Sequence, residues 1–410
     1  MSGFRKPGGH NRSRMWYRGG GPERPHLWGY AESTDGIHWD KPELGLIDYR
    51  GSTRNNLVWP LPGVSCSTLA VFIDKNPAAK PEERYKSIAT GKDLSATNDR
   101  PVIYGLVSPD GLRWRLIREK HLLRPPAGDP ALDSHNLCLW DDARQQYAIY
   151  ARGWHRRGAR PPKAEMIKKE LDQITVRTPS GEIVTVPRIR DIRRFTSPDF
   201  IDWPELYRDP SPNQADCSKV TVPGTTQIYG CGGLSDILFM FSRDGLHFRR
   251  FREAFIRPGL DGLNWHGRAI EVGPSLVPTG EGEMSLYYVE HYGTPSVRIR
   301  RGALRTDGFV SLQSDYEGGT VTTRPFSFSG SRLRMNYSTS AAGSIRVEVQ
   351  DVSGKVLPGF ALEDCPIIFG DELERIVAWK SGPDLTRLAG QGVRLKFEIK
   401  DGDLFSMRFQ

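Results

Sequence analysis

The chain has 410 residues, of which 38% are apolar, 26% charged and 10% aromatic, and it contains 43 glycines and 30 prolines. This ordinary globular composition excludes disorder, collagen and coiled coil, and at roughly 150 residues per domain the length predicts two or three domains. The net charge is +8, no stretch approaches the ~20 apolar residues of a membrane helix, and no nucleic-acid-binding signature is present, so neither a membrane span nor a nucleic-acid partner is expected.

The N-terminal segment, residues 1–10, lacks the apolar core of a signal peptide, so nothing in this chain marks it for export. Residues 11–17 match the second strand of the repeats described below. The innermost strand of the first repeat is therefore expected upstream of residue 1. On this interpretation the N-terminus is shortened, and a periplasmic or extracellular location stays open.

A short turn phrase with the pattern Ser-x-Asp-(Gly)-x-x-aromatic occurs four times, at 33–39, 108–114, 197–203 and 242–248. The starts of the copies are 75, 89 and 45 residues apart, which indicates four homologous units. The Asp side chain can accept hydrogen bonds from the following backbone N–H groups, and Gly supplies a left-handed position. We therefore predict a β-turn with a structural role and no part in catalysis.

Between the turn phrases, the sequence predicts short strands rich in β-branched and aromatic residues and bounded by Gly, Pro, Asn and Asp. Only residues 163–174 have the composition of a helix. Several strands per repeat, arranged radially, predict an all-β fold of the propeller type. The expected strands are 26–32, 69–73, 85–90, 102–107, 137–140, 147–152, 192–195, 228–231 and 237–241.

The sequence pattern changes after residue 308, and the turn phrase does not occur in the rest of the chain. Apolar and polar residues alternate in five segments, which indicates strands with one buried face. A β-sandwich accessory domain over 309–410 is therefore expected after a propeller over 1–308. The alternating segments are 333–336, 344–350, 377–379, 393–399 and 404–409.

The cysteines are odd in number and show no CxxC spacing, which argues against a disulfide framework and predicts buried free thiols. They are Cys66, Cys138, Cys217, Cys231 and Cys365.

Several phrases resemble a known group of proteins. In the first 308 residues they are 30–45, the pair 55–56, 133–136, 242–245 and 255–259; in the C-terminal part they are 318–319, 336–340, 370–371 and 393–395. These segments look like bacterial proteins related to glycoside hydrolase families 32 and 43, and the resemblance covers nearly the whole chain.

This resemblance implies a five-bladed β-propeller followed by a β-sandwich module. It also implies a central pocket with acidic residues near the starts of the inner strands: an Asp from blade one, an Asp from a middle blade and a Glu from a later blade. The chain departs from this pattern because the first Asp would lie in the segment expected upstream of residue 1, so the first blade is expected to be incomplete.

Glycoside hydrolysis requires two carboxyl groups beside the bond, one protonated to assist the leaving group and one ionised. Asp133, Asp216 and Glu271 stand at the expected starts of inner strands. We predict that Asp133 and Glu271 form the acid–base pair and that Asp216 is the third acid. An Asx-type turn is the structural alternative for Asp133.

Polar and aromatic residues near these acids are candidates for substrate binding. Histidine and asparagine can bond sugar hydroxyls, aromatic faces fit sugar rings unless they pack between blades, and arginine can bind a carboxylate or sulfate. For the acids at strand ends, a salt bridge is the alternative. The candidates are His135, Asn136, Arg152, Trp154, Asp236, Trp265, His266, Arg268, Glu290, His291 and Tyr292.

Phosphate loops, HExxH and G-x-S-x-G motifs are absent from the sequence, and no metal or other cofactor is expected. The sequence therefore predicts a glycoside hydrolase that acts on a polysaccharide-derived, possibly anionic glycan through carboxylates in the propeller pocket. A carbohydrate-binding protein without catalysis is the alternative. A polysaccharide lyase, in which His and Tyr replace the carboxylates, is a third hypothesis.

Overall fold

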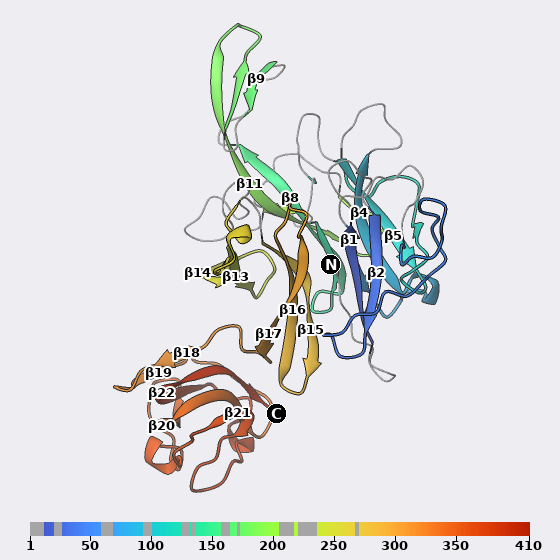
Figure 1. Cartoon of the computed structure of the whole chain (residues 1–410). Coiled ribbons are helices and arrows are strands. Elements are labelled where there is room, and N and C mark those ends of the chain that lie inside the picture. Colours follow the sequence, from blue (N-terminus) through green and yellow to red (C-terminus); the bar gives the residue numbers. More distant parts are fainter. Residues whose placement is uncertain are drawn as a thin grey trace. The chain divides into compact units, whose positions relative to one another are not determined.

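The protein is all-β, as predicted (Figure 1). A computed structural model describes residues 12–19, 27–58, 69–92, 101–124, 132, 136–156, 165–169, 173–204, 217–219, 236–266 and 270–410. The chain divides into two compact units: unit 1 comprises Met1–Thr279 and Ser285–Gly302, and unit 2 comprises Gly280–Met284 and Ala303–Gln410. Among the described residues, no helix is long and apolar enough to cross a membrane.

The described strands before residue 312 form five separate sheets. In chain order, the sheets are β1 (Ser13–Gly19) with β2 (Leu27–Ser33); β3 (Leu69–Ile73), β4 (Tyr85–Lys92), β5 (Pro101–Ser108) and β6 (Arg115–Leu116); β7 (Leu137–Asp141), β8 (Gln146–Arg156), β9 (Glu165–Lys169), β10 (Gln173–Arg177), β11 (Ile183–Ser197) and β12 (Cys217–Lys219); β13 (Ile237–Ser242) with β14 (Phe248–Ile256); and β15 (Glu271–Gly280), β16 (Glu283–Glu290) and β17 (Arg298–Arg305). Short 3-10 helices are η1 (Pro81–Glu83) and η2 (Gly262–Asn264) here, and η3 (Leu362–Asp364) and η4 (Thr386–Leu388) later.

The second sheet is apolar on both faces because it packs between two neighbouring sheets. On β3, Ala70 and Phe72 join a core cluster with residues of β7, β8 and β11, whereas Leu69 and Val71 join a cluster with residues of β1 and β2. Successive residues of a strand point to opposite faces. This packing explains why the run at 69–73 is continuously apolar instead of alternating. The predicted strand bounds there are confirmed.

The turn phrase has the structure predicted for it. In the first copy, Ser33 Oγ accepts from the Gly36 N–H at 2.8 Å, and Asp35 Oδ1 accepts from the N–H groups of Ile37 and His38 at 2.7 and 2.8 Å. The same bonds to the Asp carboxylate recur in the other three copies. In the third copy, Phe200 takes the left-handed position of the glycine, with φ 68°. In each copy, the Asp carboxylate therefore accepts hydrogen bonds from the backbone of its own turn.

The turn phrases also accept hydrogen bonds from aromatic side chains of other sheets. These bonds join β1 to the turn after β5, β8 to the turn after β13, and β16 to the turn after β2. The last sheet of the series therefore contacts the first. The donors and acceptors are Trp16 Nε1 to Gly111 O (2.8 Å), Tyr150 OH to Gly245 O (3.1 Å) and Tyr287 OH to Gly36 O (2.6 Å).

We predict that the turn phrase makes the stability of the protein sensitive to acid. The backbone N–H of His247, together with the His247 ring and the Leu246 N–H, holds the pKa of Asp244 well below its usual range. A folded-state pKa below the unfolded value of about 3.9 contributes stability above that value, and this contribution is lost as the pH falls toward the folded pKa. Asp244→Asn should therefore flatten the decrease in stability between about pH 5 and pH 3. Urea unfolding at several pH values measures the free energy of unfolding of the wild type and the variant. An equal decrease of this free energy with falling pH in both proteins would contradict the prediction.

The predicted helix at 163–174 is wrong, because this segment contributes to two strands. β10 pairs with β11 from Gln173↔Pro187 to Arg177↔Ile183, and β9 pairs with the other edge of β10. The Lys- and Glu-rich composition favoured a helix. The β-branched run 174–176 faces another such run at 184–186 across the turn, and this pairing decides the structure. In Figure 1, these strands extend away from the rest of their sheet.

Unit 2 is built on two long strands, β20 (Leu333–Asp351) and β22 (Val393–Phe409), which pair along their lengths. β18 (Leu312–Ser314) and β19 (Gly319–Thr322) pair with β22, and β21 (Asp371–Ile376) pairs with β20. Each long strand covers two predicted strands, and the register shifts between Thr339 and Ser344. A Cβ added at Gly343 would lie 2.4 Å from the Asp401 carbonyl oxygen, so glycine permits the close approach there.

The predicted strand at 377–379 is wrong, since β21 ends at Ile376 and only an isolated bridge at Trp379 follows. Val377 and Trp379 are buried in the core of unit 2, and Trp379 Nε1 donates to the Val347 carbonyl at 2.8 Å. Alternating apolar residues therefore pack into this core from a loop.

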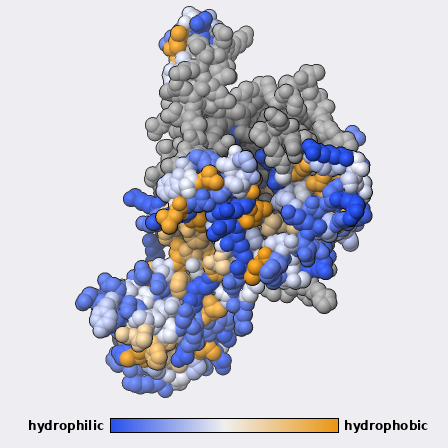
Figure 2. Space-filling model, viewed as in Figure 1, coloured by the Kyte–Doolittle hydropathy of each residue, from blue (hydrophilic) through white to orange (hydrophobic). Residues whose placement is uncertain are grey.

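On the face shown in Figure 2, hydrophilic residues predominate over hydrophobic ones.

Two of the five cysteines, Cys138 and Cys365, are free and buried, as predicted. Burial raises the pKa of both thiols. Cys66 and Cys231 lie outside the described residues. Cys217 is in β12, but its side chain is not described.

Candidate functional site

Several predicted site residues lie outside the part of the chain that the structure describes, and their predicted roles stay predictions. The same holds for the expected strand at 228–231. Trp154 is in β8, but its side chain is not described. The residues outside are Asp133, His135, Asp216 and Arg268.

Asn136 and Arg152 lie next to each other at the start of β7 and within β8. Asn136 is completely buried; its amide donates to Thr90 Oγ1 at 2.9 Å and to the Leu132 carbonyl at 3.1 Å, and accepts from the Arg152 backbone N–H at 3.0 Å. Arg152 is also buried. The Asn136 amide is thus used within the protein, where it joins β4, β7 and β8.

The remaining predicted residues gather at one end of the last sheet of unit 1. A two-residue turn at Glu281 and Gly282 joins β15 to β16, so the two strands run antiparallel. The start of β15, with the half-buried Glu271, therefore lies at the same end of the sheet as Glu290 and His291, where β16 finishes. Tyr292 follows in the same loop and is half-buried.

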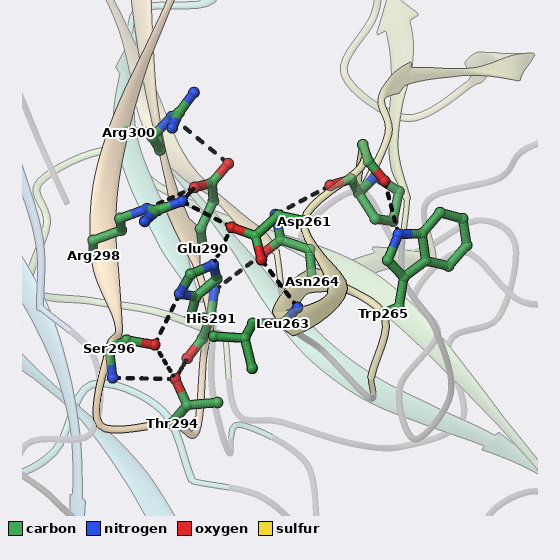
Figure 3. Close-up of polar contacts among 12 residues, drawn as sticks. Asp261, Leu263, Asn264, Trp265, Glu290, His291, Thr294, Ser296, Arg298 and Arg300 are labelled. Atoms are coloured by element: carbon green, nitrogen blue, oxygen red, sulfur yellow. Dashed lines mark hydrogen bonds and ion pairs between the residues drawn. The ribbon is translucent and has the colours of Figure 1, made fainter.

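Glu290 is a buried carboxylate paired with two arginines of β17 (Figure 3). Arg298 donates to Glu290 Oε2 from Nε and Nη2, both at 2.8 Å, and Arg300 Nε lies 3.7 Å from Oε1. Residues 298 and 300 of a strand point to the same face, which places both guanidinium groups beside one carboxylate. The salt-bridged strand end, considered above as an alternative for Glu290, is what the structure contains.

His291 is buried, with 3% of its surface exposed, and both ring nitrogens have partners. Nε2 lies 2.8 Å from Asp261 Oδ2, and Nδ1 lies 2.9 Å from Ser296 Oγ. Its backbone N–H donates to Asn264 Oδ1 at 3.2 Å. The hydrogen bond with His291 lowers the pKa of Asp261, and Arg298 lies 3.1 Å from the same carboxylate oxygen.

Sequence reasoning did not find Asp261, Asn264, Ser296 or Arg298. Asp261 precedes a glycine and accepts from the Leu263 N–H at 3.0 Å, so its local sequence indicates only a turn. Asp261 and His291 are 30 residues apart in the chain. The pairing of β16 with β17, and the loop before β15, bring them together.

Trp265 lies in the loop between β14 and β15 with 53% of its surface exposed. Its Nε1 donates to the Gly259 carbonyl at 2.7 Å, which fixes the indole relative to the loop (Figure 3). The preceding Asn264 is buried and accepts from the His291 N–H, and the Trp265 indole lies on the far side of Asn264 from His291 and Ser296 (Figure 3). His266 is half-buried, and among the described residues its Nε2 has no hydrogen-bond partner.

Asp236 is exposed and precedes β13. Because Ile237 pairs with Ile256, Asp236 lies at the end of its sheet where the Trp265 loop begins. The predicted acid Asp236 therefore lies near the start of the loop that carries the exposed Trp265.

The Asp261 and Glu290 carboxylates share one guanidinium nitrogen, Arg298 Nη2, at 3.1 and 2.8 Å. A general acid for glycoside hydrolysis must keep its proton near neutral pH, which requires a raised pKa. The pKa of Asp261 is lowered instead, chiefly by its hydrogen bond with His291. Asp261 is therefore not the general acid.

No family model matches the sequence. Two proteins of Mycobacterium tuberculosis, the uncharacterized proteins Rv1502 and MT1551, are 27% and 26% identical to the chain over 146 residues. The aligned part is 34% of this chain and 42% of each relative, so the chain spans less than half the length of the curated relatives it matches.

Solved structures similar to the chain include members of glycoside hydrolase families 32 and 43. A fructofuranosidase from Schwanniomyces occidentalis is 10% identical with a TM-score of 0.35, over 97% of this chain and 91% of that one. A family 43 arabinoxylan arabinofuranohydrolase from Bacillus subtilis is 12% identical (TM-score 0.30; 100% and 78% covered), and a family 32 hydrolase from Bifidobacterium adolescentis is 10% identical (TM-score 0.31; 97% and 78% covered). At these values the similarity transfers no blade count, residue role or substrate.

Proposed function

We propose that residues 1–308 form a five-bladed β-propeller and residues 309–410 a β-sandwich. Five sheets are described before residue 312, and their hydrogen bonds run from one sheet to the turn of another, including from the last sheet to the first. Such a cyclic series is typical of a propeller. In unit 2, the core lies against the long strands β20 and β22, as in a sandwich.

In our proposal this propeller is a glycoside hydrolase that acts on a polysaccharide-derived glycan. The observation that carries the proposal is the grouping of Glu271, the Glu290–Arg298 ion pair and the exposed Trp265 at one end of the last blade. Carbohydrate sites combine a flat aromatic face, which contacts the sugar ring, with charged groups that bond its hydroxyls. Trp265 supplies the first and Arg298 the second.

In the proposed reaction, one carboxyl group protonates the leaving oxygen, and an ionised carboxylate acts on water or on the anomeric carbon. Glu271 and Asp133 take these two roles, and Asp216 is the third acid. Glu290 is a positioning residue that fixes the guanidinium of Arg298 toward a substrate hydroxyl or carboxylate.

Glycan binding without catalysis is the second candidate. It is favoured by the ion pairs of Asp261 and Glu290, because Arg298 occupies both of these carboxylates.

Release of reducing sugar from a panel of neutral and uronate-containing oligosaccharides tests the proposal. Glu271→Gln should lower kcat/KM by roughly 100-fold or more, since it removes a proton-transferring group and keeps the shape of the side chain. The matched control is Glu253→Gln, an exposed glutamate of β14, which should retain wild-type activity.

Binding of the same oligosaccharides, measured by calorimetry, separates the two candidates. Hydrolysis by the wild type that Glu271→Gln abolishes, with binding retained, supports the hydrolase. Binding without hydrolysis in either protein supports the second candidate, and the absence of both contradicts a carbohydrate function.

A further inference from the structure

Three side chains of the cluster form a continuous hydrogen-bonded series: Ser296 Oγ lies 2.9 Å from His291 Nδ1, and His291 Nε2 lies 2.8 Å from Asp261 Oδ2 (Figure 3). We propose that Ser296 is a nucleophile, activated by His291 and Asp261, for the hydrolysis of carboxylic esters. This activity is separate from the proposed cleavage of glycosidic bonds, which uses other residues.

The charges around His291 favour the tautomer that this chemistry needs. Asp261 is kept ionised by its hydrogen bond with His291 and by Arg298, 3.1 Å away, and Glu290 is itself paired with Arg298 and Arg300. An ionised Asp261 accepts the proton of His291 Nε2, which leaves the lone pair on Nδ1 facing Ser296. Nδ1 can then take the hydroxyl proton, with the two ring nitrogens in the opposite roles from those in the Ser-His-Asp triad, where Nε2 faces the serine.

The exposure of the three residues suits these roles. His291 is buried, whereas Ser296 is an exposed residue. Thr294 Oγ1 lies 3.0 Å from Ser296 Oγ, but its own proton is donated to the His291 carbonyl at 2.9 Å. Thr294 Oγ1 can therefore only accept in its contact with Ser296, and it competes with His291 Nδ1 for the Ser296 proton.

The backbone at His291 is strained and held in place. His291 has φ 58°, a left-handed conformation that is uncommon for residues other than glycine. The Asn264 side chain accepts from its N–H, and the Thr294 N–H donates to its carbonyl at 3.0 Å. Strain of this kind concentrates at functional sites, where the surrounding structure holds it.

The proposed reaction has two steps. Ser296 Oγ forms a bond to the ester carbonyl carbon while its proton moves to His291 Nδ1; the bond to the alcohol oxygen then breaks, and that oxygen takes the proton from His291. Water next attacks the acyl-enzyme, again losing a proton to His291, and the carboxylic acid leaves as Ser296 regains its proton. Ester and water give alcohol and acid, with no other reactant.

The ester class is assigned from the loop that carries Asp261. Trp265 is an exposed, fixed aromatic face in the same loop, so we assign an acyl group carried on a sugar hydroxyl. This assignment of the alcohol rests on the proposed function. The ester chemistry itself does not, because it can be tested with a substrate that contains no sugar.

Hydrolysis of p-nitrophenyl acetate by the full chain tests the proposal. Ser296→Ala should lower kcat/KM by roughly 100-fold or more, and so should His291→Asn, in which asparagine tolerates the left-handed backbone. The control is Ser180→Ala, an exposed serine whose hydroxyl contacts that of Thr178 at 2.7 Å instead of a histidine; it should keep the wild-type rate.

Labelling with a fluorophosphonate, followed by peptide mass spectrometry, identifies the nucleophile directly. The expected adduct is on Ser296, and it should disappear in His291→Asn. An adduct elsewhere, no adduct, or a Ser296→Ala variant with the wild-type rate would overturn the proposal. Wild-type circular dichroism of the variants excludes misfolding as the cause of a loss. Release of acetate from acetylated oligosaccharides, compared with p-nitrophenyl acetate, then shows whether the alcohol is a sugar.

Discussion

Lys86→Met is expected to destabilise the protein by about 3–5 kcal/mol, because it removes one partner of a buried ion pair and leaves the other charged. Lys86 Nζ lies 2.8 Å from Asp74 Oδ2, and the two side chains are 3% and 0% exposed. Asp74 also accepts from Tyr147 OH at 2.7 Å. With the lysine gone, the Tyr147 hydroxyl and the Asn76 N–H, which donates to Asp74 Oδ1 at 3.0 Å, would be left to bond a carboxylate that water does not reach.

The effect should be large because the pair, which lies within the sheet of β3 and β4, also contacts the next sheet. Lys86 is in β4 and Tyr147 in β8, and Nζ also lies over the rings of Tyr147 and Phe200, 5.8 and 5.6 Å from their centroids. Burial and the bond to Asp74 raise the pKa of Tyr147. The tyrosine therefore stays protonated and continues to donate.

A surface ion pair nearby provides the matched control. Lys75 Nζ lies 3.8 Å from Asp142, and these side chains are 71% and 59% exposed. Lys75→Met should change the free energy of unfolding by at most about 1 kcal/mol, because water screens exposed pairs. Urea unfolding followed by tryptophan fluorescence compares the variants. If Lys86→Met were as stable as Lys75→Met, the buried pair would not have the role described here.

Trp16→Ala is expected to cost about 3–5 kcal/mol, the range for removing a large buried aromatic side chain. The Trp16 ring is completely buried and packs edge-on against Tyr30, with centroids 5.6 Å apart. Its Nε1 donates to the Gly111 carbonyl at 2.8 Å, which attaches β1 to the turn after β5. The substitution leaves a cavity between two sheets and removes one of two hydrogen bonds to the Gly111 carbonyl, which also accepts from Trp114 Nε1 at 3.1 Å.

Trp16→Phe divides this cost into two parts. It keeps an aromatic ring in the core and removes one hydrogen bond to the Gly111 carbonyl, which keeps its bond from Trp114, so a loss of about 0.5–1.5 kcal/mol is expected. The order of urea midpoints should be wild type, then Trp16→Phe, then Trp16→Ala. Equal midpoints for wild type and Trp16→Ala would mean that the first sheet does not contribute to the stability of unit 1.

The strands and turns of this protein follow largely from short stretches of its sequence. The turn phrase was predicted from seven residues because its hydrogen bonds, from Asp35 to the N–H groups of Ile37 and His38, close within the phrase itself. Segments such as 69–73 were predicted because an apolar run bounded by turn residues has few alternatives in an all-β chain. Predictions failed where local composition and pairing disagreed, as at 163–174 and 377–379.

The candidate site could be predicted only in part. Glu271, Glu290 and Trp265 were found because acids at strand ends and aromatic residues in glycine-rich loops can be recognised locally. The same reasoning could not find Asp261, Ser296 or Arg298, since each looks like an ordinary turn or strand residue in its own segment.

By itself, the sequence determined the all-β class, most strand positions and the structure of the repeated turn, because these depend on residue periodicity and on hydrogen bonds within a few residues. Only the tertiary structure decided which sheets pack together, and which side chains meet His291. Asp261 lies 30 residues before His291 in the chain, and Ser296 lies 5 residues after it. Such contacts depend on how β16 pairs with β17 and on where the loop before β15 lies, and no local pattern in the sequence encodes either.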